Sequence, residues 1–186
     1  MRKLLETFPL TVDEVRSDYF SGAIGLTHCP GMNPVPGTPW DRNLDEDLSQ
    51  IKGWGAVIVV TLLEDTEFEK LRVPNLGDVV SDLGMEWLHL PLKDRCAPSN
   101  EFETCWRMAS PKLRSILEDG DKVFIHCQAG LYRSGTIVAK LLIEFGEAPA
   151  NAIELVRAAR RYDAIDDIEL ENYLSQTRRN IDRSNA

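Results

Sequence analysis

Basic residues are scarce in this 186-residue chain, and this shortage limits the partners that its surface can attract. There are 21 Lys and Arg against 30 Asp and Glu, which gives a formal net charge of −9 at pH 7. An acidic surface repels nucleic acid and anionic lipid unless a local basic pocket overrides the average field. We therefore expect no nucleic-acid partner and no membrane partner.

Long apolar runs and paired cysteine motifs are also missing. No segment approaches the roughly 20 apolar residues that a membrane-spanning helix needs. The four cysteines contain no CxxC pair and do not form the framework of a small disulfide-stapled secreted protein. We therefore expect reduced thiols, a cytoplasmic location and no metal site, because adjacent residues such as His28-Cys29 and His126-Cys127 rarely chelate one ion.

The length and the hydrophobic pattern predict one α/β domain over residues 1–186. The chain is 43% apolar, enough for one substantial core, and it is too short for two ordinary domains. β-Branched and aromatic runs alternate with segments of helical period, which favours a mainly parallel central sheet flanked by helices. The expected strands are Gly22–His28, Ala56–Leu63, Glu86–Leu92 and Lys122–Cys127. The expected helices before the last strand are Leu44–Ile51, Val73–Leu83 with Pro74 near its start, and Glu101–Leu117.

After Cys127 the pattern is helical throughout. Apolar residues at helical spacing predict a buried stripe that ends at Gly146, and two further helices follow, from Pro149 to about Arg161 and from Ile168 to about Ile181. The stripe comprises Ile137, Val138, Leu141, Leu142 and Phe145. The Pro/Gly-rich segment Pro30–Pro39 is interpreted as a surface connection.

The segment "FIHCQAGLYRSGT", Phe124–Thr136, carries the chemistry. A loop between a strand and a helix, with Gly130 at its centre, can turn backbone N–H groups inward beside the positive end of the helix. Arg133 adds two parallel donors and a permanent charge. In such a field Cys127 should lose its proton, with a pKa in the range of about 3.5–7.5 instead of about 8.5. Taken alone, Cys127 would be one more small buried residue, but its spacing from Gly130 and Arg133 favours a phosphate site.

The residues His126–Ser134, "HCQAGLYRS", match the His-Cys-x5-Arg-Ser/Thr signature of the cysteine-dependent protein tyrosine and dual-specificity phosphatases, and the chain resembles this family. The resemblance extends from about Gly22 to about Gln176. The segments "LRVPNLGDVVSDLG", "LPLKDRCAP" and "YDAIDDIELENYL" are most similar to the type that associates with cyclin-dependent kinases.

The resemblance implies a role for each residue of the signature. Cys127 would be the nucleophile and Arg133 would bind phosphate. Ser134 would donate to the thiolate and assist breakdown of a phosphocysteine, and His126 would hold the loop and lower the pKa of the thiol. Local hydrogen bonding or helix capping is the alternative for Ser134 and His126. The phosphate-binding loop would comprise Gln128, Ala129, Gly130, Leu131 and Tyr132, although family loops usually place a small residue where Tyr132 stands.

A general acid is needed because an alkoxide leaves poorly unless it is protonated. Asp94 in "LPLKDRCAPSN" is the candidate, since it follows a strand and matches the acid loop of the family. The same side chain would then activate water, which implies a bell-shaped pH profile. Family members often place a glutamine after the signature loop, whereas this chain offers Asp166, Asp167 and Glu169 there, and Asp166 is the one considered as a substitute. Cys96 and Cys105 are candidate redox partners of Cys127, or thiols without a role.

Three functions follow from these patterns. The first is a protein phosphatase that acts on phosphotyrosine, phosphoserine or phosphothreonine in an unidentified phosphorylated protein and needs no cofactor. A site of the shallower dual-specificity kind is favoured, because no segment matches the added recognition loop of tyrosine-specific members. The second is a catalytically weak module of the same fold that binds phosphoproteins. The third is a rhodanese-like sulfurtransferase, although such enzymes typically have four residues between cysteine and arginine, whereas here there are five.

Overall fold

The structure is a computed structural model that describes residues 9–34 and 41–184. The predicted surface connection Pro30–Pro39 therefore lies partly outside the described residues, from residue 35 onward. Among the described residues, no helix is long and apolar enough to cross a bilayer.

Five strands form one sheet in the order β1-β2-β5-β3-β4. Strands β2 (Ala23–Thr27), β5 (Lys122–His126), β3 (Ala56–Thr61) and β4 (Glu86–His89) are parallel, whereas β1 (Asp13–Val15) runs antiparallel to β2 at one edge. The predicted α/β class with a mainly parallel sheet is confirmed. Because these four strands are parallel, their carboxyl ends meet at one edge of the sheet, where α/β proteins place their sites.

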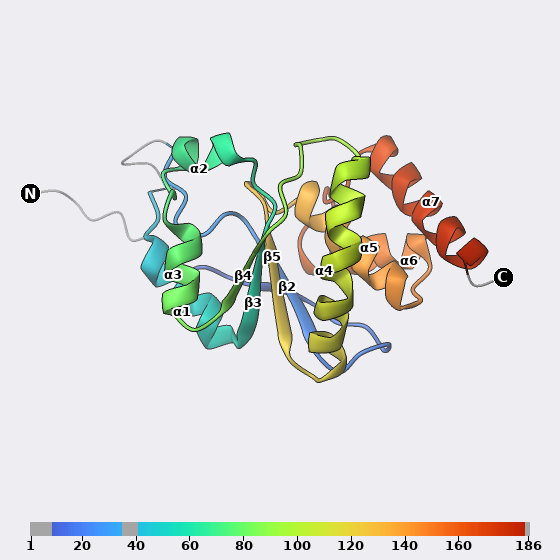
Figure 1. Cartoon of the computed structure of the whole chain (residues 1–186), viewed down its shortest axis with the longest axis horizontal. Coiled ribbons are helices and arrows are strands. Elements are labelled where there is room, and N and C mark those ends of the chain that lie inside the picture. The colour runs from blue at the N-terminus through green and yellow to red at the C-terminus, as the bar shows by residue number, and fades with distance from the viewer. Residues whose placement is uncertain (1–8, 35–40, 185–186) are drawn as a thin grey trace, which may run out of the picture.

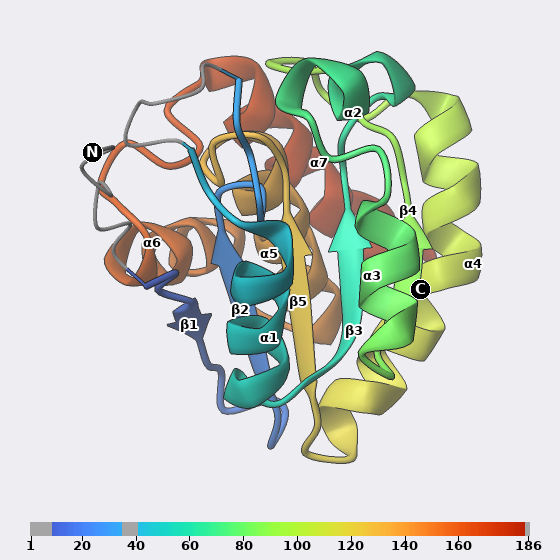
Figure 2. The ribbon, with the colours of Figure 1, turned by 90° about the vertical axis from the view of Figure 1, so that its left-hand side faces the viewer.

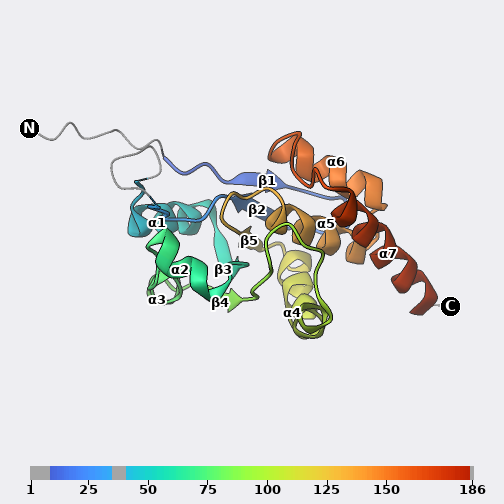
Figure 3. The ribbon, with the colours of Figure 1, turned by 90° about the horizontal axis from the view of Figure 1, so that it is seen from above.

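Helices cover both faces of the sheet (Figures 1 and 3). One face carries α1 (Leu44–Trp54), α2 (Asp65–Leu71) and α3 (Leu76–Asp82), and the other carries α4 (Asn100–Glu118), α5 (Arg133–Phe145), α6 (Pro149–Ala159) and α7 (Ile168–Ser184). Strand β5 shows how the core is divided, since Val123 and Ile125 belong to one apolar cluster and Phe124 to the other. This alternation is what a strand buried on both faces requires.

Helix α5 is the most deeply buried helix, and it begins at Arg133, directly after the signature loop. All of its residues from Arg133 to Ile143 are buried, because the sheet, α4, α6 and α7 surround it. The predicted stripe is therefore correct, but burial extends around the whole helix, and Phe145 is only partly buried. A buried helix holds its N-terminus rigidly, which fixes the position of the loop before it.

Two elements were not predicted, β1 and α2. Strand β1 has only three residues, "DEV", and two of them are charged. Helix α2 has seven residues, "DTEFEKL", and is stabilised at its start by a capping box between Glu64 and Glu67. Helix α3 begins at Leu76 and not at Val73, because a turn precedes it. Short elements held by tertiary contacts and caps carry little periodic signal.

The prediction that Pro30–Pro39 is a surface connection is wrong for its first residues. Pro30, Gly31 and Met32 are buried. The N–H of Gly31 donates to the Asp47 carboxylate at 2.8 Å, and Met32 packs in the apolar cluster beneath α1 and α3. These contacts fasten the chain after β2 to helix α1, near the edge of the sheet that carries the site.

Candidate active site

Loops from three strands converge at the carboxyl edge of the sheet, beneath α2 in the orientation of Figure 2. The β5–α5 loop (residues 127–132) begins at Cys127 and is followed by Arg133. The β3–α2 connection leads to Glu67, and the β4–α4 loop (residues 90–99) carries Asp94. Arg133 contacts both of the other two segments, through Glu67 and Asp94. The structure thus brings Asp94, which is distant in the sequence, to the loop that carries Cys127 and Arg133.

The backbone of the β5–α5 loop has its carbonyl groups turned away from the centre of the loop. Four successive carbonyl oxygens, those of residues 127–130, accept hydrogen bonds from donors on the outer side: His126 Nδ1 at 3.3 Å, Cys29 N at 2.9 Å, Arg160 Nη2 at 3.1 Å and Arg160 Nε at 3.2 Å. In a planar trans peptide the N–H points opposite to the C=O. The N–H groups that follow these carbonyls therefore face inward, and such a concave set of donors binds anions.

The sulfur of Cys127 lies at the base of this ring of donors. The N–H of Gly130 donates to Cys127 Sγ at 3.2 Å, and Ser134 Oγ lies 3.4 Å from the same sulfur. Cys127 and Ser134 are both buried. The sulfur therefore lies within reach of a loop N–H group and of a hydroxyl at the N-terminus of α5.

Glycine is required at position 130 for two reasons. Its φ angle is +71°, in the left-handed region, and a Cβ there would lie 2.4 Å from the carbonyl carbon and oxygen of Thr27. The loop therefore rests directly on the end of β2. Gln128 and Ala129 are exposed at the rim, and Leu131 and Tyr132 are half-buried.

His126 is fully buried and connects the loop to the sheet. Its Nδ1–H donates to the Cys127 carbonyl, which can only accept, so Nε2 accepts the hydroxyl of Thr61 at 2.8 Å. That hydroxyl in turn accepts from Trp87 Nε1 at 2.9 Å. Burial lowers the pKa of His126 to about 3, and the nearby Arg133 charge lowers it too. The imidazole is therefore neutral and holds the loop by hydrogen bonds.

Because His126 is neutral in the folded protein, we expect the free energy of unfolding to decrease in acid. The folded-state pKa of His126 lies below the unfolded value of about 6.5. Its contribution to the free energy of unfolding is therefore fully present above pH 6.5 and is lost as the pH falls towards 3. The loss is about 1.4 kcal/mol per pH unit, or about 2 kcal/mol at pH 5. Urea unfolding at pH 7 and pH 5 measures it. His126→Asn should reduce the difference between the two pH values by that amount, and an unchanged difference would contradict the prediction.

Arg133 is buried and is held in place by a carboxylate. Its Nη1 and Nη2 donate to the two oxygens of Glu67 at 2.5 and 2.9 Å, and Nη1 also donates to the carbonyls of Leu62 and Leu92. Burial opposes the charge, but these bonds and the neighbouring charges of Cys127 and Asp94 raise the pKa of Arg133 above its ordinary value. Burial also tends to raise the pKa of Glu67, and the hydrogen bonds from Arg133 and the Glu64 backbone overcome this and lower it. The guanidinium is therefore permanently charged and fixed in orientation.

Asp94 faces the same guanidinium from the β4–α4 loop. Its Oδ1 lies 3.2 Å from Arg133 Nε, and its side chain is 54% exposed. The adjacent Arg95 lies over the ring of Tyr132, with 4.1 Å between the guanidinium carbon and the ring centroid. Tyr132 therefore forms part of the boundary between the two loops, and its ring also packs against the main apolar cluster.

Sequence reasoning missed Glu67 and Arg160. Glu67 lies in the short helix α2, 66 residues before Arg133, and Arg160 directly follows α6. Arg160 also donates to Asp13 of β1 at 2.6 Å, so it ties the β5–α5 loop to the edge strand. The only available signal for Glu67 was its capping-box position, which predicts a helix start and not a contact with Arg133.

The remaining candidates from the sequence lie around the site. Asp166 is exposed, and Asp167 caps α7 by accepting from the N–H of Glu169 at 2.8 Å, so the proposed substitution of Asp166 for a glutamine stays a prediction. Cys96 is half-buried and Cys105 is exposed. Within residues 9–34 and 41–184, no group of three His, Cys, Asp or Glu side chains could hold a metal ion.

Cys29 provides an internal comparison with Cys127, because each follows a histidine at the end of a parallel strand. Cys29 is also buried, but its sulfur contacts the carbonyl of Pro30 at 3.5 Å and no N–H donor among the described residues. Burial raises the pKa of the Cys29 thiol well above its ordinary value. The same dipeptide therefore gives a neutral thiol at one site and a sulfur among donors at the other.

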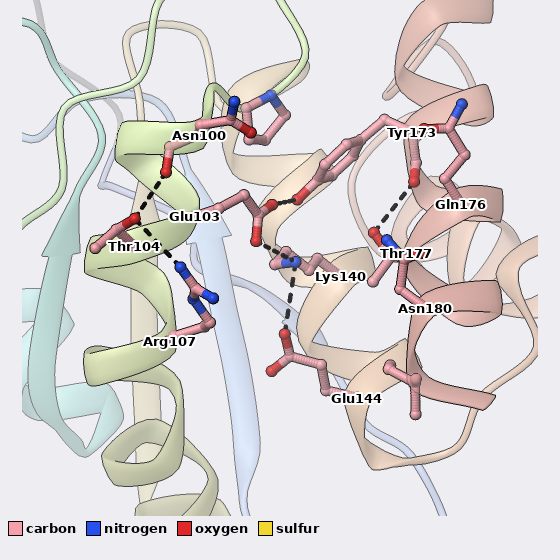
Figure 4. Close-up of a pocket in the computed structure, with 12 residues that line it drawn as sticks. Asn100, Glu103, Thr104, Arg107, Lys140, Glu144, Tyr173, Gln176, Thr177 and Asn180 are labelled. Carbon is pink, nitrogen blue, oxygen red and sulfur yellow. Dashed lines mark hydrogen bonds and ion pairs between the residues drawn. The ribbon is translucent and has the colours of Figure 1, made fainter. Parts of the chain in front are cut away.

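A separate cleft of about 730 Å³ lies between α4, α5 and α7 (Figure 4). At its centre, Lys140 is almost fully buried between Glu103 at 3.2 Å and Glu144 at 3.6 Å. The hydroxyl of Tyr173 donates to Glu103, and Trp106 Nε1 donates to Glu144 at 2.6 Å. None of the predicted site residues lines this cleft. Its polar groups satisfy one another, which is typical of packing between helices.

Comparison with known proteins shows the family to which the chain belongs. Residues 9–153 match the family model of Cyclin-dependent kinase inhibitor 3 (CDKN3). Cyclin-dependent kinase inhibitor 3 of Rattus norvegicus is 32% identical over 153 residues, which cover 80% of this chain and 71% of that protein. Protein tyrosine phosphatase type IVA 2 of Mus musculus is 29% identical over 143 residues, which cover 75% of this chain and 80% of that protein.

A solved structure agrees with the fold over nearly the whole chain. The crystal structure of kinase associated phosphatase, with its catalytic site cysteine replaced by serine, superposes with a TM-score of 0.84 and 28% identity. The match covers 95% of this chain and 98% of that one. The chain therefore belongs to the cyclin-dependent kinase inhibitor 3 family and is a cysteine-dependent phosphomonoesterase of the dual-specificity phosphatase superfamily.

Proposed function

We propose that this chain hydrolyses phosphate esters on protein side chains through a phosphocysteine formed on Cys127. Arg133 and the inward N–H groups of the β5–α5 loop would bind the phosphate, and Asp94 would be the general acid and base. The observation that carries the proposal is the position of Cys127 Sγ, 3.2 Å from the N–H of Gly130 and 3.4 Å from Ser134 Oγ, inside a ring of backbone donors.

Arg133 has donors in the right place for a phosphate. Glu67 binds one edge of the guanidinium through Nη1 and Nη2, and Nη1 also donates to the backbone carbonyls of Leu62 and Leu92. The Nε–H has no hydrogen-bond acceptor among the described residues, although Asp94 lies near it. Nε and the second hydrogen of Nη2 lie on one edge of the guanidinium and can bind two phosphate oxygens in parallel. Phosphate binding at this edge would release Asp94 from Arg133.

The first chemical step transfers the phosphoryl group to sulfur. A lone pair of Cys127 Sγ attacks phosphorus, the S–P bond forms, and the P–O bond to the substrate side chain breaks on the opposite side. The electron pair of the broken bond goes to the leaving oxygen, which takes a proton from the Asp94 carboxyl group. Arg133 and the loop N–H groups stabilise the charge on the three equatorial oxygens.

The second step returns the enzyme to its starting state. A water molecule attacks phosphorus and gives a proton to the Asp94 carboxylate, and the S–P bond breaks with its electrons on Cys127. Ser134 Oγ, 3.4 Å from the sulfur, would donate a hydrogen bond to the departing thiolate. His126 takes no proton in either step because it is neutral and fully bonded, so its role is to hold the loop.

The substrate that fits this site is a phosphorylated protein. The chain carries a net charge of −9, whereas Arg133, Arg160, Arg95 and Lys93 surround the β5–α5 loop or lie in the loop beside it. The attraction for a phosphate is therefore local. The proposal includes a reducing compartment such as the cytoplasm, because all four cysteines are free thiols. A phosphoprotein-binding module remains the second candidate, because Asp94 pairs with Arg133 and would have to move before it could act.

Turnover in the presence of a chelator separates these functions. The purified chain should release phosphate from p-nitrophenyl phosphate and from peptides that contain phosphotyrosine or phosphothreonine, without added metal. Binding of these peptides without release would favour the binding module. Thiosulfate followed by mass spectrometry tests for sulfur transfer, and a persulfide on Cys127 would contradict the phosphatase mechanism.

Asp94→Asn tests the general acid. The amide keeps the size of the side chain but cannot donate the proton, so the loss should grow as the leaving group becomes poorer. We expect kcat/KM, which reports the transfer to sulfur and not the hydrolysis that follows, to fall about 10²–10³-fold with a phosphothreonine peptide and less than about tenfold with p-nitrophenyl phosphate. Steady-state rates on the two substrates measure this difference. Equal losses on both would exclude Asp94 as the acid.

A further inference from the structure

Two adjacent residues of the β4–α4 loop meet two adjacent residues at the end of the β5–α5 loop. Asp94 pairs with Arg133, with 3.2 Å between Oδ1 and Nε, and Arg95 lies over Tyr132, with 4.1 Å between the guanidinium carbon and the ring centroid. The first contact joins the groups proposed to react. The second joins side chains that take no part in the chemistry, and the family signature does not explain it.

The backbone at Arg95 is shaped for this double contact. In an extended chain, successive side chains point to opposite sides, so Asp94 and Arg95 could not both face one loop. Arg95 instead has φ +52°, in the left-handed region that residues other than glycine rarely adopt. A residue held there against its preference needs surrounding contacts to keep it, and such residues cluster at functional sites. The stacked Tyr132 ring is such a contact.

The backbone of Tyr132 is fixed by hydrogen bonds to the first turn of helix α5. Its carbonyl accepts from both the N–H and the hydroxyl of Thr136, at 2.9 and 2.8 Å. The ring is half-buried and packs against the main apolar cluster, whereas Arg95 is exposed. The ring face is therefore held by helix α5, and its exposed partner, Arg95, belongs to the loop that carries Asp94. A planar guanidinium on an aromatic face is attracted by the ring quadrupole.

We infer that Tyr132 and Arg95 are a positioning pair that holds the β4–α4 loop over the phosphate site during turnover. This inference rests on the proposed function. When phosphate occupies the Nε edge of Arg133, Asp94 loses its partner there, and the Asp94–Arg133 contact no longer holds the loop. The Arg95–Tyr132 contact involves neither group, so it persists and keeps Asp94 within reach of the leaving oxygen. Tyr132 therefore serves proton transfer to poor leaving groups.

The test compares substrates that need the acid to different degrees. Tyr132→Leu keeps an apolar side chain but removes the aromatic face, and Arg95→Gln removes the cation from an exposed position that folding tolerates. Each should lower kcat/KM on a phosphothreonine peptide about five- to tenfold more than it lowers kcat/KM on p-nitrophenyl phosphate, so the ratio of the two rates falls by that factor. Tyr132→Phe keeps the aromatic face and should therefore keep the ratio of the two rates within about twofold of the wild-type ratio. The double variant should lose no more than either single one.

Arg114→Gln is the matched control. Arg114 lies over Phe145, at the opposite end of helix α5, with 4.9 Å between the guanidinium carbon and the ring centroid. Its loss should leave the ratio of the two rates unchanged. Suppose that Asp94→Asn still discriminates between the two substrates. Equal losses on both substrates in Tyr132→Leu and Arg95→Gln, or a ratio of the two rates like that of Arg114→Gln, would then overturn the positioning pair and leave the acid assignment intact. If Asp94→Asn does not discriminate, the acid assignment fails, and the pair fails with it.

Discussion

Cys127→Ser is expected to lower kcat on p-nitrophenyl phosphate by at least about 10⁴-fold while the protein stays folded. A serine hydroxyl is a weak nucleophile without an adjacent base, and His126 cannot act as one because both of its nitrogens are occupied by Thr61 and the Cys127 carbonyl. The smaller oxygen can still accept from the N–H of Gly130, so the ring of donors should persist. Initial rates measure activity, and calorimetry measures binding of a phosphopeptide, which we expect to be retained.

Cys29→Ser is the matched control for this prediction. It makes the same change in the same His-Cys context, at a buried sulfur whose contact is the carbonyl of Pro30. A serine hydroxyl can make that contact too, so activity should stay within about threefold of wild type. Substantial activity in Cys127→Ser, or an equal loss in Cys29→Ser, would show that Cys127 is not the nucleophile.

Arg133→Lys is expected to lower kcat/KM about 10³-fold. A single ammonium group cannot bind both oxygens of Glu67 at one end and two phosphate oxygens along the other edge, so phosphate binding and stabilisation of the reacting phosphoryl group are lost together. KM should therefore rise and kcat should fall, which steady-state kinetics on an aryl phosphate will measure. The variant should also be less stable by about 1–3 kcal/mol, because Glu67 loses hydrogen bonds at a largely buried position.

Glu67→Gln tests whether Glu67 only orients the Arg133 guanidinium or also acts on the substrate. The amide oxygen still accepts from one guanidinium nitrogen of Arg133, whereas the amide NH2 cannot accept from the other, so residue 67 keeps one of its two bonds and kcat/KM should fall about tenfold or less. A loss in Glu67→Gln as large as that in Arg133→Lys would mean that Glu67 acts on the substrate itself. A normal KM in Arg133→Lys would contradict the role of Arg133 in phosphate binding.

The sequence was sufficient to predict the strands and helices whose pattern is long and periodic. The four parallel strands and helices such as α4 and α5 lie where apolar periodicity and cap residues place them. The pattern failed at β1 and α2, where a few charged residues are held by pairing and caps. It also failed at Pro30–Met32, where one hydrogen bond to the buried Asp47 and packing under α1 bury a segment of loop composition.

The site shows the same division between local and long-range information. Cys127, Gly130 and Arg133 lie within seven positions of one another, so their spacing alone predicts a loop that binds an anion. Glu67 and Arg160 support that loop from other elements, 66 residues before Arg133 and 30 residues after Gly130. Contacts of this kind depend on how the parallel strands align, which periodicity does not encode. Tyr132 combines both kinds of information. The sequence shows that it stands where family loops usually have a small residue, but only the structure shows its contact with Arg95.

Direct detection of a phosphorylated cysteine tests the central claim. Wild-type protein mixed with an excess of p-nitrophenyl phosphate and quenched in acid within milliseconds should carry one phosphate, and mass spectrometry of its peptides should place that phosphate on Cys127. Asp94→Asn should accumulate more of this species, because the base that activates water is missing. Turnover without phosphate on any cysteine, or phosphate on a residue other than Cys127, would contradict the mechanism.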